Sequence, residues 1–459
     1  MTTDAAVSRP ERPLLGQVLA NAGVLLGGRT ANALISLAYT AVAARLLGVR
    51  EVGVLILINA FAQLIGEVVK FNSWQTVLHY GAQPLAEGHK ARFQQVIRFT
   101  LVLDLASGLV GVAIAAALAL FAGHHLGWEQ QHAPAAALYC LTAAIMSPAT
   151  ATGILRLFNR FDILAAQAPI GSAVRLLGSA AALALGASLN LFLLVWALGT
   201  IASYAYVTAT SVRELHRRGL LSGFTIRGPM AGGLPGAWRF AWATNFSSSL
   251  ETAFTHAITL VVGAVVGPAP AALWRIGRQV ADALAKPAKL LVPALYPELA
   301  RLRTSHGEHA MRRLALQVGL LGGGVGTILL LVSATAGRPL LSLVLGEAFE
   351  GAAGVMTWQV GAAVIGIWAL PLEPMLVSLG RPGDALKVRL VVSAVLLAVL
   401  VPVVEAFGLA GAGAALVCAM VGLAAGMFFM LQRNAGRAPA AAAYEIACAD
   451  DPARAKRNP

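Results

Sequence analysis

Charged residues are scarce in this sequence. Only 12% of its 459 residues are charged and 58% are hydrophobic, whereas soluble domains carry about 25% charged residues. Many apolar runs exceed the roughly 20 residues that a helix needs to cross a bilayer. Such unbroken runs fit helices rather than the alternating strands of a barrel. The composition excludes a soluble globular protein and predicts an all-α polytopic membrane protein.

Cysteine pairs and nucleotide-binding motifs are also lacking. The three cysteines form no CxxC pair, and no GxxxxGK[ST] sequence occurs. We therefore expect no disulfide framework, no phosphate-binding loop and no ATP hydrolysis by this chain. His124, His125 and His132 lie near Glu129, but no further acid or cysteine pattern fixes a coordination geometry there. We expect neither a metal site nor a cofactor.

The apolar runs predict twelve transmembrane helices. Their ranges are 19–44, 51–71, 93–121, 134–156, 162–186, 190–212, 238–266, 271–294, 312–334, 352–379, 386–406 and 409–431. The first run is too long for a signal-peptide core, so we expect it to be retained as a helix after a cytoplasmic N-terminus, 1–18. A cytoplasmic linker, 213–237, separates two six-helix halves, 19–212 and 238–431. The alanine-rich, charged segment 432–459 is predicted to be a disordered cytoplasmic tail.

The positive charges predict the orientation. With both termini inside, the predicted inner segments hold 22 Lys and Arg residues, and the outer segments hold only Arg45, Arg50 and Arg338. This asymmetry is the positive-inside pattern of a multi-pass protein of the cytoplasmic (inner) membrane. The net charge of +13 is spread over short loops rather than gathered in a basic arm, so we expect no nucleic-acid partner.

One predicted span carries a stripe of charges. The segment 271–296, AALWRIGRQVADALAKPAKLLVPALY, contains Arg275, Arg278, Asp282, Lys286 and Lys289 at gaps of 3, 4, 4 and 3. These gaps place all five within an arc of roughly 80° on one helix face. Charged groups inside a membrane span almost always face a bundle interior or a wet cavity. The stripe predicts a basic cavity wall and an anionic cargo. Alternatively, the end residues reach opposite interfaces and Asp282 neutralises a neighbour.

An internal repeat supports the two halves. A shift of 219 residues places LLGVREVGVL (46–55) over VVGPAPAALW (265–274) as corresponding outer turns. The same shift pairs two sets of residues at identical spacing: Asn59, Gln63, Glu67 and Lys70 with Arg278, Asp282, Lys286 and Lys289. Arg29 in the first span likewise has Ser248 opposite it. Two halves in the same orientation form a parallel repeat, with cargo bound between them.

The corner AARLLGVREVGVL, a second helix and a basic inner loop together resemble the oligosaccharide-lipid flippases of bacterial polysaccharide synthesis. These belong to the multidrug/oligosaccharidyl-lipid/polysaccharide exporter superfamily. The resemblance implies an outward-opening V lined by helices 1, 2, 7 and 8, which moves polyprenyl-pyrophosphate-linked sugars for polysaccharide or lipopolysaccharide assembly. It implies membrane lipids, a polymerase and chain-length proteins as partners. The cations on the matching helices are Arg29, Lys70, Arg275, Arg278, Lys286 and Lys289.

Other functions stay open at this point. Glu67, Glu251, Asp282 and Glu373 are candidate proton or cation sites, or they offset nearby cations. A drug or cation antiporter of the same architecture should expose acids, and the first span has no evident match to the acids of drug-exporting relatives. A membrane polysaccharide polymerase or ligase would need a sizeable outer loop with catalytic groups. The longest predicted outer segments, 122–133 and 337–352, are short and hold no obvious constellation.

Overall fold

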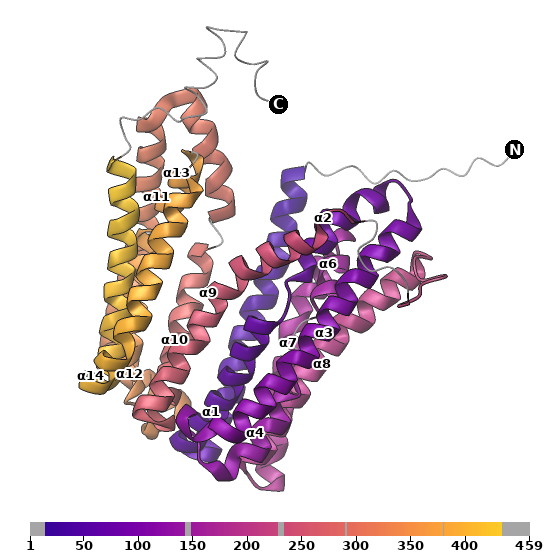
Figure 1. Cartoon of the computed structure of the whole chain (residues 1–459). Coiled ribbons are helices and arrows are strands. Elements are labelled where there is room, and N and C mark those ends of the chain that lie inside the picture. Colours follow the sequence, from indigo (N-terminus) through magenta and orange to yellow (C-terminus); the bar gives the residue numbers. More distant parts are fainter. Residues whose placement is uncertain (1–13, 143–147, 228–233, 290–291, 380, 434–459) are drawn as a thin grey trace, which may run out of the picture. The chain divides into compact units, whose positions relative to one another are not determined.

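A computed structural model describes residues 14–142, 148–227, 234–289, 292–379 and 381–433. Every regular element in these ranges is a helix (Figure 1), which confirms the predicted all-α class. The helices group into two compact units, unit 1 (residues 1–260) and unit 2 (residues 261–459), and each unit is described by itself. The predicted division into halves at the linker 213–237 stays a prediction.

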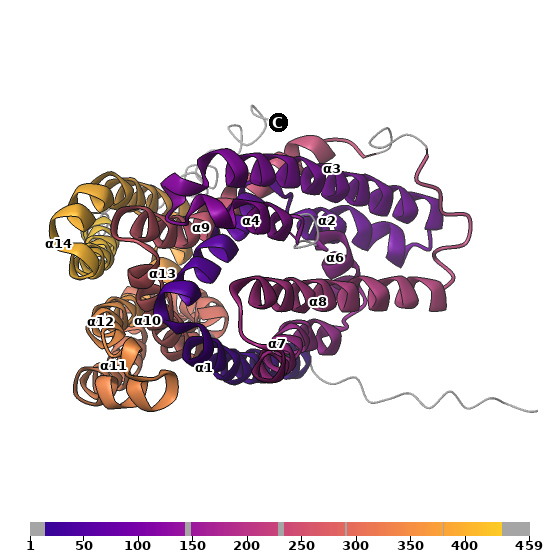
Figure 2. The same ribbon diagram turned by 90° about the horizontal axis from the view of Figure 1, so that it is seen from below.

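Among its described residues, unit 1 is built from long helices with three shorter ones among them. Its helices are α1 (Leu14–Val69), α2 (Ser73–Ala86), α3 (Lys90–Ala122), α4 (Ala133–Cys140), α6 (Ala149–Leu157), α7 (Phe161–Leu185), α8 (Leu189–Arg217) and α9 (Ala237–Val266), which continues past the division, with short 3-10 turns Gly123–Leu126 and Gln130–His132. Figure 2 shows α1 beside α7, and α2 and α6 between α3 and α8. The short helices α2 and α6 are thus held on both sides by long ones.

Unit 2 contains two very long helices. Its elements are α10 (Pro268–Lys289), α11 (Val292–Leu345), the 3-10 turn Glu347–Phe349, α12 (Ala352–Trp368), α13 (Leu372–Ser378) and α14 (Pro382–Arg433). In the described ranges of both units, seven helical stretches are long and apolar enough to cross a membrane. Two of them, Gly23–Val69 and Gly383–Arg433, each cover most or all of two predicted spans.

Glycine marks the corners that the sequence repeat predicts. The first two predicted spans meet at Gly48, whose φ is 76°, within α1. Residue 267, at the predicted shift of 219, is also a glycine with positive φ (102°), and it separates α9 from α10. The left-handed region carries little cost for glycine alone. Both corners therefore contain a glycine with positive φ, at positions that the repeat pairs. Gly408 (φ 58°) makes a similar break between the last two predicted spans.

The helix α11 extends beyond the predicted span 312–334 at both ends. The predicted inner segment between spans 8 and 9 is helical, because α11 runs unbroken from Val292 to Leu345. That segment contains no proline after Pro297 and is rich in Leu, Arg, Glu and Ala, which favour helix. The same helix covers much of the predicted outer segment 337–352. The predicted span 352–379 corresponds to the apolar stretch Ala352–Val377, within which Pro371, lacking a backbone donor, separates α12 from α13.

The start of α9 packs on the predicted inner side of unit 1. Leu234, Ala237 and Ala241 join a buried cluster with residues of α3 and with Phe71. The Tyr80 hydroxyl on α2 donates a hydrogen bond to the carbonyl of Pro235 (3.0 Å). These contacts fasten the end of the predicted linker to α2 and α3.

Candidate functional site

Two arginines from different helices of unit 1 lie within electrostatic reach of each other. Arg29 is exposed on α1, and Arg156 lies in the last turn of α6. The guanidinium carbon of Arg156 lies 4.0 Å from the centroid of the Trp74 ring, in the first turn of α2. The Nε atom of Arg156 is buried and has no hydrogen-bond partner among the described residues. We call Arg29, Arg156 and Trp74 the two-arginine site.

A glycine allows α6 to approach α2 at this site. A Cβ atom on Gly153 would lie 2.7 Å from the Cβ of Val77 and 3.0 Å from the Cα of Trp74. Gly153 lies three residues before Arg156, so the two share one face of α6. The close helix contact brings the Arg156 guanidinium over the Trp74 ring, where a cation is attracted by the ring quadrupole. The geometry of the site thus depends on the packing of two short helices.

The polar stripe of the second predicted span divides into two networks. At one end, Gln63 donates from Nε2 to the side-chain oxygen of Asn59 (3.3 Å), and Tyr139 of α4 donates its hydroxyl to the same oxygen (2.8 Å). At the other end, Lys70 forms an ion pair with Glu67, and both side chains are about one-fifth exposed. The predicted cavity cation Lys70 is therefore neutralised by a residue of its own stripe.

Arg175 is a half-buried cation that the sequence did not place in the cavity set. Its guanidinium donates to the Tyr39 hydroxyl (3.3 Å) and to Oγ1 of Thr200 (2.9 Å), and it lies 5.3 Å from the Trp196 ring centroid. A Cβ atom on Gly199 would lie 2.6 Å from the Cγ of Arg175. These contacts from α1, α7 and α8 make Arg175 part of the packing of unit 1.

The charged stripe of α10 is partly described in unit 2. Arg278 lies in ion-pair distance of Asp282, with Nε 3.2 Å from Oδ1. Arg275 is half-buried. The side chains of Lys286 and Lys289 lie outside the described residues. Because Asp282 faces Arg278 one turn away, the described part of the stripe contains a neutralised pair, as the alternative interpretation anticipated.

Three of the four candidate coupling acids have a cationic neighbour. Glu67 pairs with Lys70, Asp282 pairs with Arg278, and Glu373 of α13 accepts a hydrogen bond from Arg389 of α14 (2.7 Å). The side chain of Glu251 lies outside the described residues. The arrangement supports a role for these three acids in offsetting cations.

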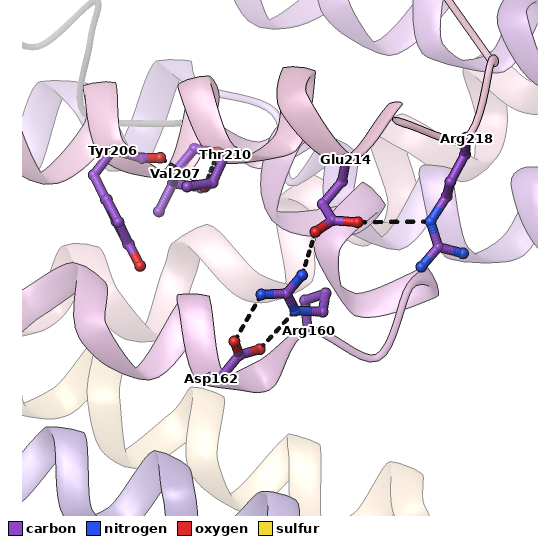
Figure 3. Close-up of polar contacts among 7 residues, drawn as sticks. All are labelled: Arg160, Asp162, Tyr206, Val207, Thr210, Glu214 and Arg218. Carbon is purple, nitrogen blue, oxygen red and sulfur yellow. Dashed lines mark hydrogen bonds and ion pairs between the residues drawn. The ribbon is translucent and has the colours of Figure 1, made fainter. Parts of the chain in front are cut away.

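Arg160 joins the start of α7 to the end of α8, as Figure 3 shows. It binds Asp162 through two hydrogen bonds of 2.9 and 3.0 Å and also pairs with Glu214. The Glu214 side chain is only 10% exposed and also faces Arg218 at 3.7 Å. The hydrogen bonds to Asp162 raise the pKa of Arg160. The two arginines and two acids of this cluster pair with one another, so little charge is left to bind a ligand.

Unit 2 also contains an apolar groove of about 730 Å³ along the two arms of α14. Valines of the first arm, such as Val395 and Val399, face small residues of the second arm, such as Gly411 and Ala415, and Trp358 of α12 lies beside them. Its chemistry suits a hydrocarbon chain, and it has almost no polar surface.

Two groups in unit 1 escaped the sequence interpretation. The sequence predicts Arg156 to be an inner-loop cation, because its position at the end of a predicted span gives no sign of Trp74, which is far away in the sequence. Asp104 of α3 was passed over, although it is the sole acid in the predicted span 93–121. A lone carboxylate in an apolar span is a usable signal, since such residues are rare and usually functional.

Comparison with known proteins identifies relatives of this chain. No protein-family model matches it. The inner membrane protein YghQ of Escherichia coli (strain K12) is 33% identical over 330 residues, which make up 72% of this chain and 92% of that protein. Similarity at this level over nearly all of the relative indicates common ancestry.

Solved structures share the fold. A multidrug resistance MATE family transporter of the MOP superfamily, in an inward-facing conformation, matches 90% of this chain and 98% of its own, with a TM-score of 0.69 and 14% identity. The lipid II flippase MurJ, in an inward closed conformation, matches 89% of this chain and 87% of its own, with a TM-score of 0.66 and 11% identity. At such low identity the likeness shows the fold, and the cargo has to be argued from the residues.

Proposed function

The chain belongs to the family of the inner membrane protein YghQ and has the fold of MOP superfamily transporters, and from this premise we propose that it flips polyprenyl-pyrophosphate-linked oligosaccharides. The oligosaccharide would move from the inner to the outer leaflet of the cytoplasmic membrane by alternating access. Polysaccharide or lipopolysaccharide assembly would then consume it, together with a polymerase and chain-length proteins of the same pathway. The predicted orientation, with both termini inside, is part of this proposal.

The two-arginine site is the observation that carries the proposal. Arg29 and Arg156 hold two like charges within electrostatic reach, and no described carboxylate pairs with either. A buried guanidinium nitrogen without a partner costs free energy, which an incoming acceptor would recover. A pyrophosphate supplies several negative charges and oxygen acceptors, and guanidinium groups bind phosphate oxygens through charge-assisted, often bidentate hydrogen bonds. The site therefore fits the head group of the proposed cargo.

The membrane potential would assist the proposed direction of transport. An inside-negative potential favours outward movement of an anion by about 2.3 kcal/mol per charge per 100 mV. The cargo could thus leave the inner leaflet without ATP hydrolysis. The stripe cations Arg275, Arg278, Lys286 and Lys289, with Lys70, are proposed as further contacts along the path.

The sign of the site argues against the two alternatives. A drug or cation antiporter should present unpaired acids beside its cargo, whereas Glu67, Asp282 and Glu373 each face a cation and the two-arginine site is cationic. The fold is shared with transporters and gives no support to the polymerase or ligase alternative. We therefore favour an anionic, lipid-linked cargo.

Flipping in proteoliposomes tests the proposal. The probe is a fluorescent polyprenyl-diphosphate-linked disaccharide, and the assay follows its accessibility to a membrane-impermeant quencher over time. We expect Arg29→Gln and Arg156→Gln each to slow flipping about tenfold or more, because a hydrogen bond to a charged group contributes about 1.5–3 kcal/mol. Arg213→Gln is the matched control, since Arg213 is exposed on α8 of the same unit.

Each variant is first checked for monodispersity, so that misfolding is not read as lost transport. Wild-type flipping rates in the Arg29→Gln, Arg156→Gln double variant would contradict the proposal. Efflux of an organic cation such as ethidium, with no flipping of the labelled lipid, would favour the antiporter instead.

A further inference from the structure

Asp104 lies near the middle of α3 and holds the start of α6. Its Oδ2 atom accepts a hydrogen bond from the backbone N–H of Thr150 (2.8 Å) and another from the Thr150 hydroxyl (2.7 Å). Thr150 is the second residue of α6, where backbone donors have no partner within the helix and the helix dipole favours a negative charge. One oxygen of the carboxyl group is thus fully engaged.

The other oxygen is buried. Oδ1 of Asp104 and the hydroxyl of Ser73 each lack a partner in hydrogen-bonding geometry among the described residues, although the hydroxyl lies close enough to the carboxyl group to interact with it. Ser73 is 1% exposed, and Thr76, one turn later on α2, is 0% exposed and also has an unpartnered hydroxyl. Buried polar atoms are nearly always hydrogen-bonded, so three such oxygens on facing helices require an explanation.

The charges around Asp104 are few. Among the described residues, Lys70, directly after α1, is a cation within electrostatic reach of Asp104, and it is already paired with Glu67. α2 and α6 contribute the hydroxyls of Ser73 and Thr150, which do not titrate. His79, further along α2, stacks on Phe240 of α9 at a centroid distance of 4.5 Å. A permanently ionised Asp104 would therefore compete with Glu67 for one lysine.

We propose that Asp104 is a proton-binding site, in which Oδ1 takes up a proton from water and the resulting O–H donates to the Ser73 hydroxyl. Proton uptake removes the carboxylate charge of Asp104, so that Lys70 pairs with Glu67 without competition. The proton returns to water when Asp104 ionises again, so no other reactant is needed. A single proton satisfies two of the three unpartnered oxygens, and the neutral carboxyl group keeps its contacts with Thr150.

Protonation of Asp104 also acts on the two-arginine site, and this part of the inference rests on the proposed function. α6 carries both Thr150 and Arg156, which are about 9 Å apart along the helix at 1.5 Å per residue. On α2, Ser73 is followed directly by Trp74. Hydrogen bonds to an ionised carboxylate are stronger than those to a neutral one, so protonation loosens the hold on α6. Proton binding thus regulates the position of Arg156 over Trp74.

Infrared difference spectroscopy of the full-length protein in nanodiscs measures the protonation directly. The C=O stretching band of a protonated carboxyl group should appear as the pH is lowered, disappear in Asp104→Asn and move in frequency in Asp104→Glu. Glu129→Gln is the control, since Glu129 forms an exposed pair with Arg50 in the same unit, and it should leave the band unchanged. Thr150→Val should shift the pH midpoint.

Three results of the infrared experiment would contradict the proton-binding site or its regulatory role. If no band assignable to Asp104 appears at any pH, or if the band persists at every pH, the carboxyl group does not titrate and is only an anchor for α6. If the band responds to sodium at constant pH, the site binds a metal cation. The readout needs no cargo, so a failure of the flipping assay would leave it intact. A titrating band together with pH-independent flipping would overturn the regulatory part alone.

Discussion

The contact between α1 and α7 at Gly28 should be sensitive to one methyl group. A Cβ atom on Gly28 would lie 2.2 Å from the carbonyl oxygen of Ala165 and 2.9 Å from its carbonyl carbon. Carbon–oxygen contacts between packed helices are normally about 3.3–3.6 Å. The two helices would have to separate locally by about 1 Å, because a backbone carbonyl cannot rotate away as a side chain does.

The preceding residue supplies a matched control. An alanine Cβ at Gly27 would meet no atom within 4 Å. Both substitutions replace a helical glycine by alanine, and this replacement stabilises the helix by about 0.8–1.0 kcal/mol. Gly28→Ala alone adds the cost of overpacking, about 1–3 kcal/mol, and we take the upper end because the clash is with backbone. Gly27→Ala should therefore be neutral or slightly stabilising, and Gly28→Ala should lose about 2 kcal/mol.

Thermal unfolding in detergent, followed by the fraction of monodisperse protein after heating, tests this difference. At about 2–4 °C per kcal/mol for units of this size, the two variants should differ by about 6–12 °C. Arg29 follows Gly28 directly, so Gly28→Ala should also slow flipping of the labelled lipid. If Gly28→Ala unfolds at the same temperature as Gly27→Ala, α1 and α7 do not approach as closely as described, and the placement of Arg29 loses its support.

Two further substitutions test the packing of each unit. Glu214→Gln removes a largely buried carboxylate, leaves Arg160 with Asp162 alone and deprives Arg218 of its acid; it should cost about 1–3 kcal/mol. Glu129→Gln, in an exposed pair, should change the melting temperature little, and equal effects of the two substitutions would refute the distinction. Gly277→Ala would place a Cβ 2.7 Å from Oε1 of Gln359 and should lower the melting temperature by several degrees. Gly354→Ala on α12 is the control, because its Cβ would meet nothing within 4 Å and the melting temperature should stay unchanged. A Gly277→Ala variant as stable as wild type would show that α10 and α12 can adjust.

Long helices and their corners could be predicted because the determinants are local. The predicted span 162–186 corresponds to α7 at Phe161–Leu185, since a run of apolar residues long enough to cross a bilayer is visible without knowledge of its neighbours. The same holds for Gly48 and the glycine 219 residues later, whose positive φ only glycine adopts readily. α2 was missed because it is a short helix of 14 residues, and a search for spans of about 20 apolar residues does not register it.

The candidate site was less accessible because it depends on which helices meet. Spacing placed the α10 stripe on one face, yet it could not show that Arg278 and Asp282 neutralise each other within that face. Arg156 gained its role from Trp74 on another helix, and Asp104 gained its role from Thr150. The contacts of Arg156 with Trp74 and of Asp104 with Thr150 join residues far apart in the sequence, so periodicity carries no information about them.

The proposed anion site at Arg156 and the proposed proton site at Asp104 both depend on the same two short helices, α2 and α6. Ser73 and Trp74 are neighbours on α2, and Thr150 and Arg156 lie on the same nine-residue helix, α6. A helix this short moves as one body, so a change in its hold on Asp104 displaces Arg156. By thermodynamic linkage, an anion bound at the two-arginine site must change proton affinity at Asp104 by the same factor as the proton changes anion affinity. The anion adds negative charge to the same unit, which favours the neutral carboxyl group. Cargo entry and proton uptake should therefore promote each other, and this would provide a way to reset the site once the cargo has left.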